Sequence, residues 1–405
     1  MNEEAEAEPP AGASERRRRW RWVVPIVALV VVATFYVAGG LYFSNVLDER
    51  ALDAAALRAA TAGIDPDVEV MRLDREGPPT AMVLHSLDGD LGVAAEGVQG
   101  LRWAEGYGRL EATEQTGAGT IEGSFTLVNG DPPVPGTPAE LDVRAYPMDP
   151  ADAGLGLRAL TVTGPLGNYP AWLGSAAGDT WAIVVHGNSL SPADGLRMVP
   201  ILTEAGFPTL VATFRNDPGA PDDPSGKLRY GLTEWRDLEA MVRLALGRGS
   251  DEVVLAGYSM GGGVVMAFLQ RSELAREVRA VILDAPMLDF STTVDDNASR
   301  EELPLLGLPL PRSLTSVAKW MAARRFGVDW SELDYLADTD RYDMRFLVFH
   351  GTDDTTVPIG TSLEFAKLMP DRVTVLSCTG AEHIGCWNLD PSGYRNAVHA
   401  FLGNG

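Results

Sequence analysis

Cysteine, histidine and lysine are all scarce in this sequence of 405 residues, and no internal repeat is visible. Only two cysteines are present, which excludes a small scaffold held together by many disulfides. A metal-binding HExxH motif and a nucleotide-binding Walker loop are also absent. The hydrophobic fraction of 45% and the charged fraction of 22% are ordinary for a chain that buries a core. The length predicts two folded domains, or three.

Basic side chains are outnumbered, with 33 against 56 acidic ones and a formal net charge of -23. Residues 1–22 hold five acidic and five basic side chains and residues 23–43 hold none, so residues 44–405 carry the whole net charge. A body with this excess of acidic side chains repels phosphate backbones and anionic lipid headgroups, which argues against nucleic acid as a partner. Only three of the bases are lysines, and alanine, glycine and aspartate are abundant. This composition is typical of GC-rich bacterial genomes.

One uncharged run of 21 residues, Val23 to Phe43, predicts a transmembrane helix. At 1.5 Å per residue it spans about 30 Å, the thickness of the hydrocarbon core. Arginines crowd the segment just before it, and tryptophan and tyrosine stand at its edges. The positive-inside rule then places residues 1–22 in the cytoplasm and everything after the run outside, as a single-pass protein of the cell membrane.

A cleaved signal peptide is the alternative interpretation of the same run. Its apolar region would be only 7–15 residues long, and Ala38-Gly39-Gly40 is a weak cleavage site. Both interpretations export the body of the protein.

Beyond the membrane, the pattern predicts a linker over residues 44–65, with a short helix or tether at 48–62, and a small β-rich domain over 66–150. In GTIEGSFTLV, Ile121 and Phe125 share one face and Glu122 and Ser124 the other, as in a half-buried strand. Glycine and proline separate about five such segments. The strand candidates here are 68–73, 80–87, 100–112, the GTIEGSFTLV segment and 139–146.

Residues 155–405 alternate short apolar segments with amphipathic ones. The alternation predicts an α/β domain in which a mostly parallel sheet is covered by helices on both faces. Functional groups of such a domain belong in loops at the carboxyl ends of the strands. The strand candidates are 181–187, 208–214, 252–259, 280–286, 346–351 and 373–378, and the helix candidates lie near 192–205, 232–247, 260–272, 361–369 and 391–402.

The string GYSMG at the junction of a predicted strand and helix carries the chemistry, with Ser259 at its centre. A nucleophile elbow holds its serine in a sharp, strained turn that lifts the hydroxyl clear of the sheet. Residues two before and two after crowd this turn, so Gly257 and Gly261 fit the need for small residues. A glycine-rich loop with an incidental serine is the alternative.

A serine hydroxyl needs a base, and five histidines make elimination feasible. His383 lies in the loop TGAEHIGCWN after the last predicted strand, where a base would reach Ser259. The remaining histidines lie in the β-rich region, at two strand ends and in the last helix: His85, His186, His350 and His399.

A carboxylate should orient the imidazole, and FLVFHGTDDTTVP supplies two past a strand. Asp354 is favoured over Asp353, and Asp284 at the end of the preceding strand is a third candidate. The order serine, aspartate, histidine along the chain is that of the α/β-hydrolase triad.

With these motifs in place, residues 155–405 resemble an α/β-hydrolase, in the elbow GYSMGG, the strand end VVHGN, the acid loop HGTDDTTVP and the histidine loop GAEHIG. The resemblance implies a serine hydrolase in which the backbone N–H groups of Met260 and Asn188 form the oxyanion hole. The lipase-type HGGG is replaced here by HGNS. The implied two-step reaction, through an acyl-enzyme on Ser259, needs no metal or organic cofactor.

Cys378 and Cys386 bracket His383. In an exported chain an even pair favours a disulfide, which would pin the loop of the histidine. Two unpaired core thiols are the alternative.

The resemblance also implies a cap inserted at about 287–340, whose apolar residues would wall a pocket or simply pack. We expect an esterase or thioesterase acting on a small-molecule or lipidic acyl ester. A peptidase like prolyl oligopeptidase and a non-catalytic envelope scaffold are the other hypotheses, and the sequence predicts no oligomeric state.

Overall fold

A computed structural model describes residues 12–74, 80–89, 97–117, 119–304 and 306–403. Its contacts divide the chain into two compact units. One contains the chain up to Asp48 together with Ala298–Val328, and the other contains Glu49–Asn297 and Asp329–Gly405.

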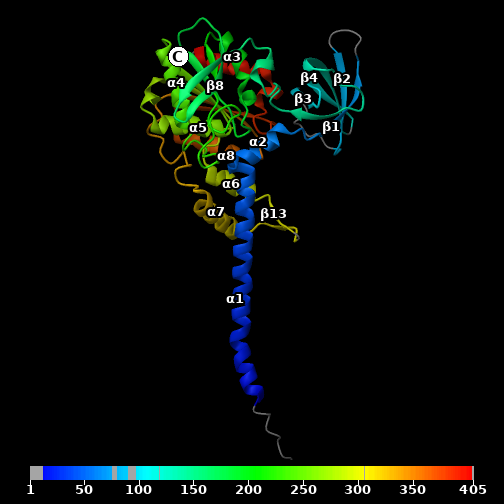
Figure 1. Cartoon of the computed structure of the whole chain (residues 1–405), viewed down its shortest axis with the longest axis vertical. Helices are drawn as coiled ribbons and strands as arrows, with labels where there is room; N and C mark the ends of the chain where they lie inside the picture. The colour runs from blue at the N-terminus through cyan, green and yellow to red at the C-terminus, as the bar shows by residue number, and fades with distance from the viewer. Residues whose placement is uncertain (1–11, 75–79, 90–96, 118, 305, 404–405) are drawn as a thin grey trace, which may run out of the picture. The chain divides into compact units, whose positions relative to one another are not determined.

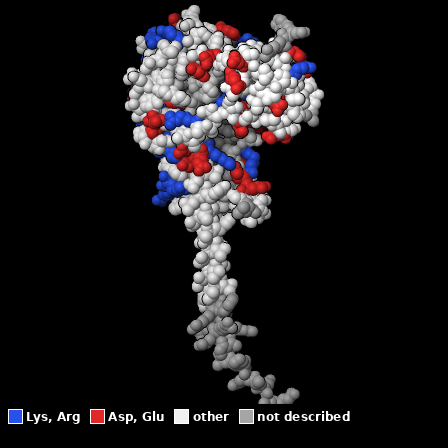
Figure 2. Space-filling view, turned by 45° about the vertical axis from the view of Figure 1, so that its right-hand side comes forward, with Lys and Arg blue, Asp and Glu red and all other residues white. Residues whose placement is uncertain are grey.

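The first unit is built on the long helix α1 (Gly12–Leu47), which is drawn as the blue rod in Figure 1. From Trp22 onward it is long and apolar enough to cross a membrane, by length and composition only. Figure 2 shows an uncharged white surface along the described part of this helix. The helix is longer at both ends than the predicted span of 23–43.

Part of the expected cap insertion packs against α1 in the same unit. It forms a short hairpin of β13 (Glu302–Leu303) and β14 (Leu308–Pro309), followed by helix α7 (Arg312–Phe326). Leu303, Leu310 and Leu314 form a small buried cluster with Tyr36 and Phe43 of α1. The sequence analysis predicted an insertion here but not its packing against the apolar helix.

In the second unit, the linker runs through a turn of π-helix (Asp48–Leu52) into α2 (Ala54–Ala62). Asp53 caps α2, because its Oδ1 accepts a hydrogen bond from the N–H of Ala56 at 2.9 Å. The other carboxylate oxygen of Asp53 pairs with Lys227 Nζ at 2.9 Å, so the linker is fastened to the loop before α4.

The β-rich domain is a closed antiparallel barrel with the strand order β1-β2-β5-β4-β3-β6. Its interior holds alternate residues of the strands, such as Val68 and Val70 of β1 and Met82 and Leu84 of β2. The expected single strand at 100–112 was wrong, because the chain turns at Ala104–Glu105 and forms a hairpin. The strands are β1 (Val68–Leu73), β2 (Thr80–Ser86), β3 (Gly97–Trp103), β4 (Gly106–Gly117), β5 (Thr120–Gly130) and β6 (Pro138–Asp142).

The α/β domain contains an eight-stranded sheet with the order β16-β15-β12-β11-β9-β10-β8-β7. All neighbours from β16 to β10 are parallel, and the hairpin of β8 and β7 adds two antiparallel strands at the edge. The sequence analysis missed this hairpin, because β7 is largely exposed and lacks an apolar run. The strands are β7 (Arg158–Gly164), β8 (Gly167–Gly174), β9 (Trp181–Val185), β10 (Thr209–Val211), β11 (Val253–Tyr258), β12 (Val278–Asp284), β15 (Arg345–Gly351) and β16 (Val373–Cys378).

Helices cover both faces of this sheet. Two of them, α3 (Met198–Glu204) and α10 (Pro391–Gly403), share one buried cluster with side chains of β9, β11, β12 and β15. Another pair, α4 (Trp235–Gly247) and α5 (Met260–Arg271), pack on each other and on β9 and β11 outside that cluster. The remaining α-helices of the domain are α6 (Phe290–Ala298), α8 (Ile359–Leu368) and α9 (Cys386–Leu389).

Candidate active site

Ser259 occupies a strained turn between β11 and α5, with φ 50° and ψ −119°. Such a conformation costs an L-residue about 1–3 kcal/mol, and it persists only where the surroundings hold it. The N–H of Ser259 donates to the carbonyl of Asp284 at 2.9 Å, and its own carbonyl accepts from the N–H of Met287 at 2.9 Å. Backbone bonds on both sides therefore hold the turn.

Glycine is required on both sides of the turn, because backbone carbonyl oxygens lie too close to positions 257 and 261 for a side chain to fit. A Cβ at Gly261 would lie 2.3 Å from the carbonyl oxygens of Val185 and His186, and one at Gly257 would lie 2.9 Å from the carbonyl oxygen of Gly261. Both distances are too short for any side chain, which explains why the turn reads G-x-S-x-G.

The structure brings Ser259, His383 and Asp354 into one hydrogen-bonded chain. Ser259 Oγ lies 2.8 Å from His383 Nε2, and His383 Nδ1 lies 2.8 Å from Asp354 Oδ2. Ser259 follows β11, Asp354 follows β15 and His383 follows β16, so the carboxyl ends of parallel strands converge here. Ser259 is 8% exposed and the side chain of His383 21% exposed, which leaves this pair reachable from solvent.

Asp354 is held by more than the histidine. Its Oδ1 accepts from the N–H groups of Thr356 at 2.8 Å and Val357 at 2.9 Å, and its Oδ2 lies 3.3 Å from His350 Nε2. Burial alone would raise the pKa of this carboxyl, but the hydrogen bonds from His350, His383 and Val357 outweigh burial and hold the pKa well below 3.8. The carboxylate is therefore ionised at neutral pH.

The other two acid candidates lie elsewhere. Asp353 is adjacent in sequence, but its Oδ1 accepts from the hydroxyl of Thr352 and it does not reach His383. Asp284 is buried, which raises the pKa of its carboxyl, and its Oδ2 accepts from Tyr394 Oη at 3.0 Å.

The two residues expected to supply oxyanion-hole donors lie beside the serine. Met260 is the first residue of α5, so its N–H has no partner within the helix. Asn188 follows Gly187, at which a Cβ would lie 3.2 Å from the Cβ of Ser259. Both residues lie close to Ser259, and their role as oxyanion-hole donors stays a prediction.

The remaining histidines have structural partners. His186 directly follows β9 and is fully buried, with its Nδ1 2.9 Å from the carbonyl of Gly187, its Nε2 2.7 Å from Asp217 Oδ2 and its ring stacked on Phe214. His350 Nδ1 lies 2.8 Å from the hydroxyl of Ser362 on α8. His399 bonds the carbonyl of Ile201, and His85 lies exposed beside Thr120.

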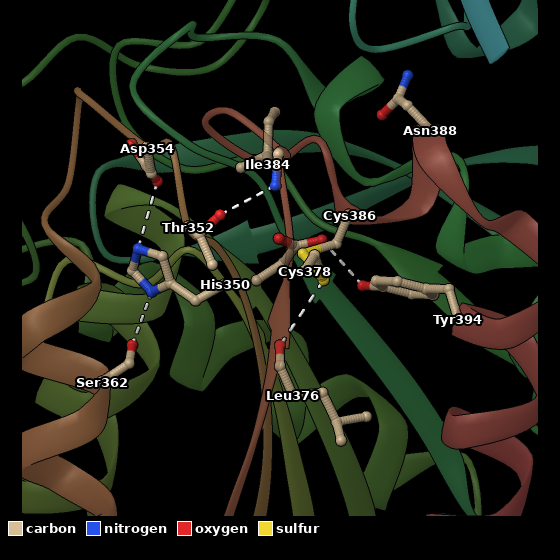
Figure 3. The surroundings of a disulfide bond; sticks show 12 residues. His350, Thr352, Asp354, Ser362, Leu376, Cys378, Ile384, Cys386, Asn388 and Tyr394 are labelled. Carbon is tan, nitrogen blue, oxygen red and sulfur yellow. Dashed lines mark hydrogen bonds and ion pairs between the residues drawn. A yellow bond between two sulfur atoms is a disulfide. The ribbon is translucent and has the colours of Figure 1, made fainter. Parts of the chain in front are cut away.

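A disulfide joins Cys378, at the end of β16, to Cys386, at the start of α9 (Figure 3). The pair closes the loop that carries His383. In the structure the two cysteines are paired rather than free.

Two residues that the sequence analysis missed support the same loop. Arg197 is fully buried, and its Nη1 donates to the carbonyl of Ile384 at 2.9 Å and to Asn388 Oδ1 at 2.8 Å. Asn388 Nδ2 donates to the carbonyls of Val98 at 2.6 Å and Val143 at 2.8 Å. No local pattern marks either residue, because their partners lie 187 to 290 positions away along the chain.

A cavity of about 380 Å³ borders His383, between its loop and the barrel. The barrel contributes Asp67, Ser86 and Gln99 to the wall, and the loop contributes Gly380 to Gly385. Among the described residues, no group of three or more histidine, cysteine or acidic side chains could hold a metal ion.

Comparisons with known proteins place this geometry in context. Residues 182–397 match the profile of a family described as the alpha/beta hydrolase family. A non-heme chloroperoxidase of Streptomyces lividans is 25% identical over 252 residues, which is 54% of this chain and 89% of that protein. α1 and the barrel lie outside the residues that match the family.

Two esterases are among the similar solved structures. That of Pyrococcus furiosus is 19% identical, with a TM-score of 0.48, covering 63% of this chain and 95% of its own. That of Thermogutta terrifontis, with malate bound, is 17% identical, with a TM-score of 0.43, covering 61% of this chain and 98% of its own.

Proposed function

Because the chain belongs to the alpha/beta hydrolase family, we propose that it is a serine hydrolase that cleaves carboxylic ester or thioester bonds. One observation carries the proposal: the hydrogen-bonded chain from Ser259 Oγ through His383 to Asp354, with both contacts at 2.8 Å. A nucleophile, a base and a group that orients the base are the parts that acyl transfer needs.

In the first half-reaction, His383 Nε2 takes the proton of the Ser259 hydroxyl while Oγ attacks the acyl carbonyl. The N–H groups of Met260 and Asn188 donate to the oxyanion that develops on the carbonyl oxygen. Asp354, kept ionised by its own hydrogen bonds, stabilises the imidazolium. His383 then gives the proton to the leaving alcohol or thiol, and the acyl group remains on Oγ.

In the second half-reaction, a water molecule replaces the alcohol. His383 takes a proton from the water, the hydroxide attacks the acyl carbonyl and the proton passes to Ser259 Oγ as the acid leaves.

Retention of α1 as a membrane anchor is part of the proposal, with residues 1–22 in the cytoplasm and the catalytic domain outside. Its support is the packing of Gly39 and Gly40 against α7, where a Cβ on either glycine would lie within 3 Å of Leu314 or Val317. Cleavage at Ala38-Gly39-Gly40 would remove the partner of α7. This contact favours an anchor over a cleaved signal peptide.

Hydrolysis of p-nitrophenyl esters of graded acyl length by the full chain in detergent tests the activity. We expect Ser259→Ala to abolish turnover and Asp354→Asn to lower kcat by about 10⁴. Asp353→Asn, which removes a neighbouring carboxylate outside the hydrogen-bonded chain, is the matched control and should retain activity. Equal rates for Ser259→Ala and the native chain would refute the proposal, and cleavage of peptide anilides in preference to esters would favour a peptidase.

A further inference from the structure

Residues 303–328 differ in charge from the rest of the exported body. This segment, the basic insertion, contains four basic side chains and no acidic one, although Glu301 and Glu302 directly precede it and Glu302 begins the hairpin. The basic residues all belong to α7: Arg312, Lys319, Arg324 and Arg325.

The basic insertion also exposes large apolar side chains. Leu306 is 63% exposed, Leu308 56% and Trp320 58%. Leu306 lies in the turn of the β13–β14 hairpin and Trp320 on α7, with the guanidinium of Arg324 5.7 Å from the Trp320 ring. Segments that lie in a membrane interface typically expose leucine and tryptophan beside arginine and lysine.

The register of α7 on α1 gives the depth of the insertion. Tyr36 Oη lies 2.8 Å from Ser313 Oγ near the start of α7, and Ser44 Oγ accepts from Arg325 Nη1 at 2.6 Å near its end. The two helices therefore run in the same direction, and α7 begins beside Tyr36. Figure 1 shows α7 next to α1.

Tyr36 lies seven residues before Phe43, the end of the uncharged run. At 1.5 Å per residue, the start of α7 is about 10 Å below the level at which that run ends. The hairpin packs at the same level, because Leu303 and Leu310 share a cluster with Tyr36 and Phe43. An apolar run that fills the hydrocarbon core would carry this part of the insertion into the outer leaflet.

We propose that the basic insertion is seated in the interface of the outer leaflet of the membrane, with Leu306, Leu308 and Trp320 facing the acyl chains. The inference rests on the retention of α1 as an anchor, as proposed above. A segment seated in this way would place the insertion of the hydrolase domain at the surface from which lipidic esters are drawn.

A bilayer fits this surface better than a protein partner does. The exposed leucines and Trp320 belong to the unit that contains the membrane-crossing candidate, and α7 packs along that helix. The hairpin satisfies part of its own backbone, as the N–H groups of Leu306 and Gly307 donate to the carbonyl of Leu303, which suits the interface.

Spin-label accessibility in the full chain tests the proposal. Both native cysteines are paired, so single labels can be placed through Leu306→Cys and Trp320→Cys. Leu29→Cys, on the apolar part of α1, reports whether the anchor is in lipid, and Asp371→Cys, in the exposed turn before β16, reports a water-facing site. Each protein is reconstituted in nanodiscs of phosphatidylcholine and phosphatidylglycerol, and ester hydrolysis checks that it is folded.

We expect labels at 306 and 320, like that at 29, to collide more often with oxygen than with a water-soluble nickel chelate, and the label at 371 to show the reverse. If 29 is in lipid while 306 and 320 behave like 371, the seating is refuted and the anchor stands. If the label at position 29 is also exposed to water, the proposal that α1 is a membrane anchor is refuted, and the proposed seating of the insertion is refuted with it. Ester hydrolysis is read separately in both cases, so the loss of either does not depend on the enzymatic proposal.

Discussion

Arg197 and Asn388 lie 191 positions apart in the sequence and meet in the core, where Arg197 Nη1 donates to Asn388 Oδ1 at 2.8 Å. Both side chains are buried, and each reaches further. Arg197 holds the carbonyl of Ile384, the residue after His383, and Asn388 holds the carbonyls of Val98 and Val143 in and beside the barrel. The barrel is thereby linked to the loop of the proposed catalytic base.

Replacement of Asn388 tests whether this link positions His383. Asn388→Asp keeps an acceptor for Arg197 but loses the amide donor, and Asn388→Ala loses both. Since buried carbonyls are left unpaired, we expect the free energy of unfolding to fall by about 2–4 kcal/mol in each variant. We also expect kcat to fall more than KM changes.

The matched control for Asn388 is Asn168→Ala, at an exposed position of the β7–β8 hairpin, which should leave both quantities unchanged. Chemical denaturation and ester kinetics measure them. A destabilised Asn388 variant with native kcat would assign Asn388 a purely structural role.

The disulfide should stabilise the chain through its short loop. Cys378 and Cys386 are eight residues apart. Closing a loop of this length lowers the conformational entropy of the unfolded chain, which raises the free energy of unfolding by about 2.5 kcal/mol. We expect the double variant Cys378→Ser, Cys386→Ser to lose stability of this size and to lose part of its kcat, because the loop of His383 becomes less restrained. Reduced native protein should behave like the double variant, and an unchanged melting temperature in both would contradict this account.

Acid should weaken the contribution of Asp354 to stability. Its pKa is held below the ordinary value of 3.8, so the folded state favours the carboxylate and gains stability from it above that value. As the pH falls from about 5 through 3.8 and lower, this stability is lost. The difference in unfolding free energy between the native chain and Asp354→Asn should therefore shrink on acidification.

Urea unfolding at a series of pH values measures that difference. Asp353→Asn removes one acidic charge from the same loop and serves as the control. A difference for Asp354→Asn that stays constant across the acid range would show that the carboxylate is not selectively stabilised in the folded protein.

The candidate site was largely predictable from the sequence, because its residues sit in short local motifs. The turn around Ser259 needs small residues at 257 and 261, and a strand-end loop has few places for Asp354 and His383. The pairing of Arg197 with Asn388 and the closure of the barrel were not predictable, because both depend on contacts between residues far apart in sequence. His350, which supports Asp354, was noticed only as a strand-end residue.

The packing of α1 on α7 escaped the sequence analysis for a different reason. Gly39 and Gly40 suggested only a weak cleavage site, whereas in the structure they allow α7 to approach. Periodicity identifies an apolar helix, but it does not show which of its faces meets protein.

Gly40→Leu should disrupt this packing. A Cβ at Gly40 would lie 2.7 Å from Val317 Cγ1 and 2.9 Å from Met321 Sδ, so a leucine must push α7 away, at a cost of about 1–3 kcal/mol. We expect faster tryptic cleavage at the basic residues of α7 in nanodiscs. Ala38→Leu, at an exposed position of the same helix, is the control, and equal cleavage rates in the two variants would count against the helix contact.

Covalent labelling of the native full chain with a fluorophosphonate tests the central claim most directly, since the probe reacts only with an activated serine. The account predicts one adduct per chain, mapped by mass spectrometry to Ser259, and none in Ser259→Ala or His383→Ala. A folded native chain that takes up no probe, or takes it up equally in Ser259→Ala, would contradict the claim that His383 activates this hydroxyl.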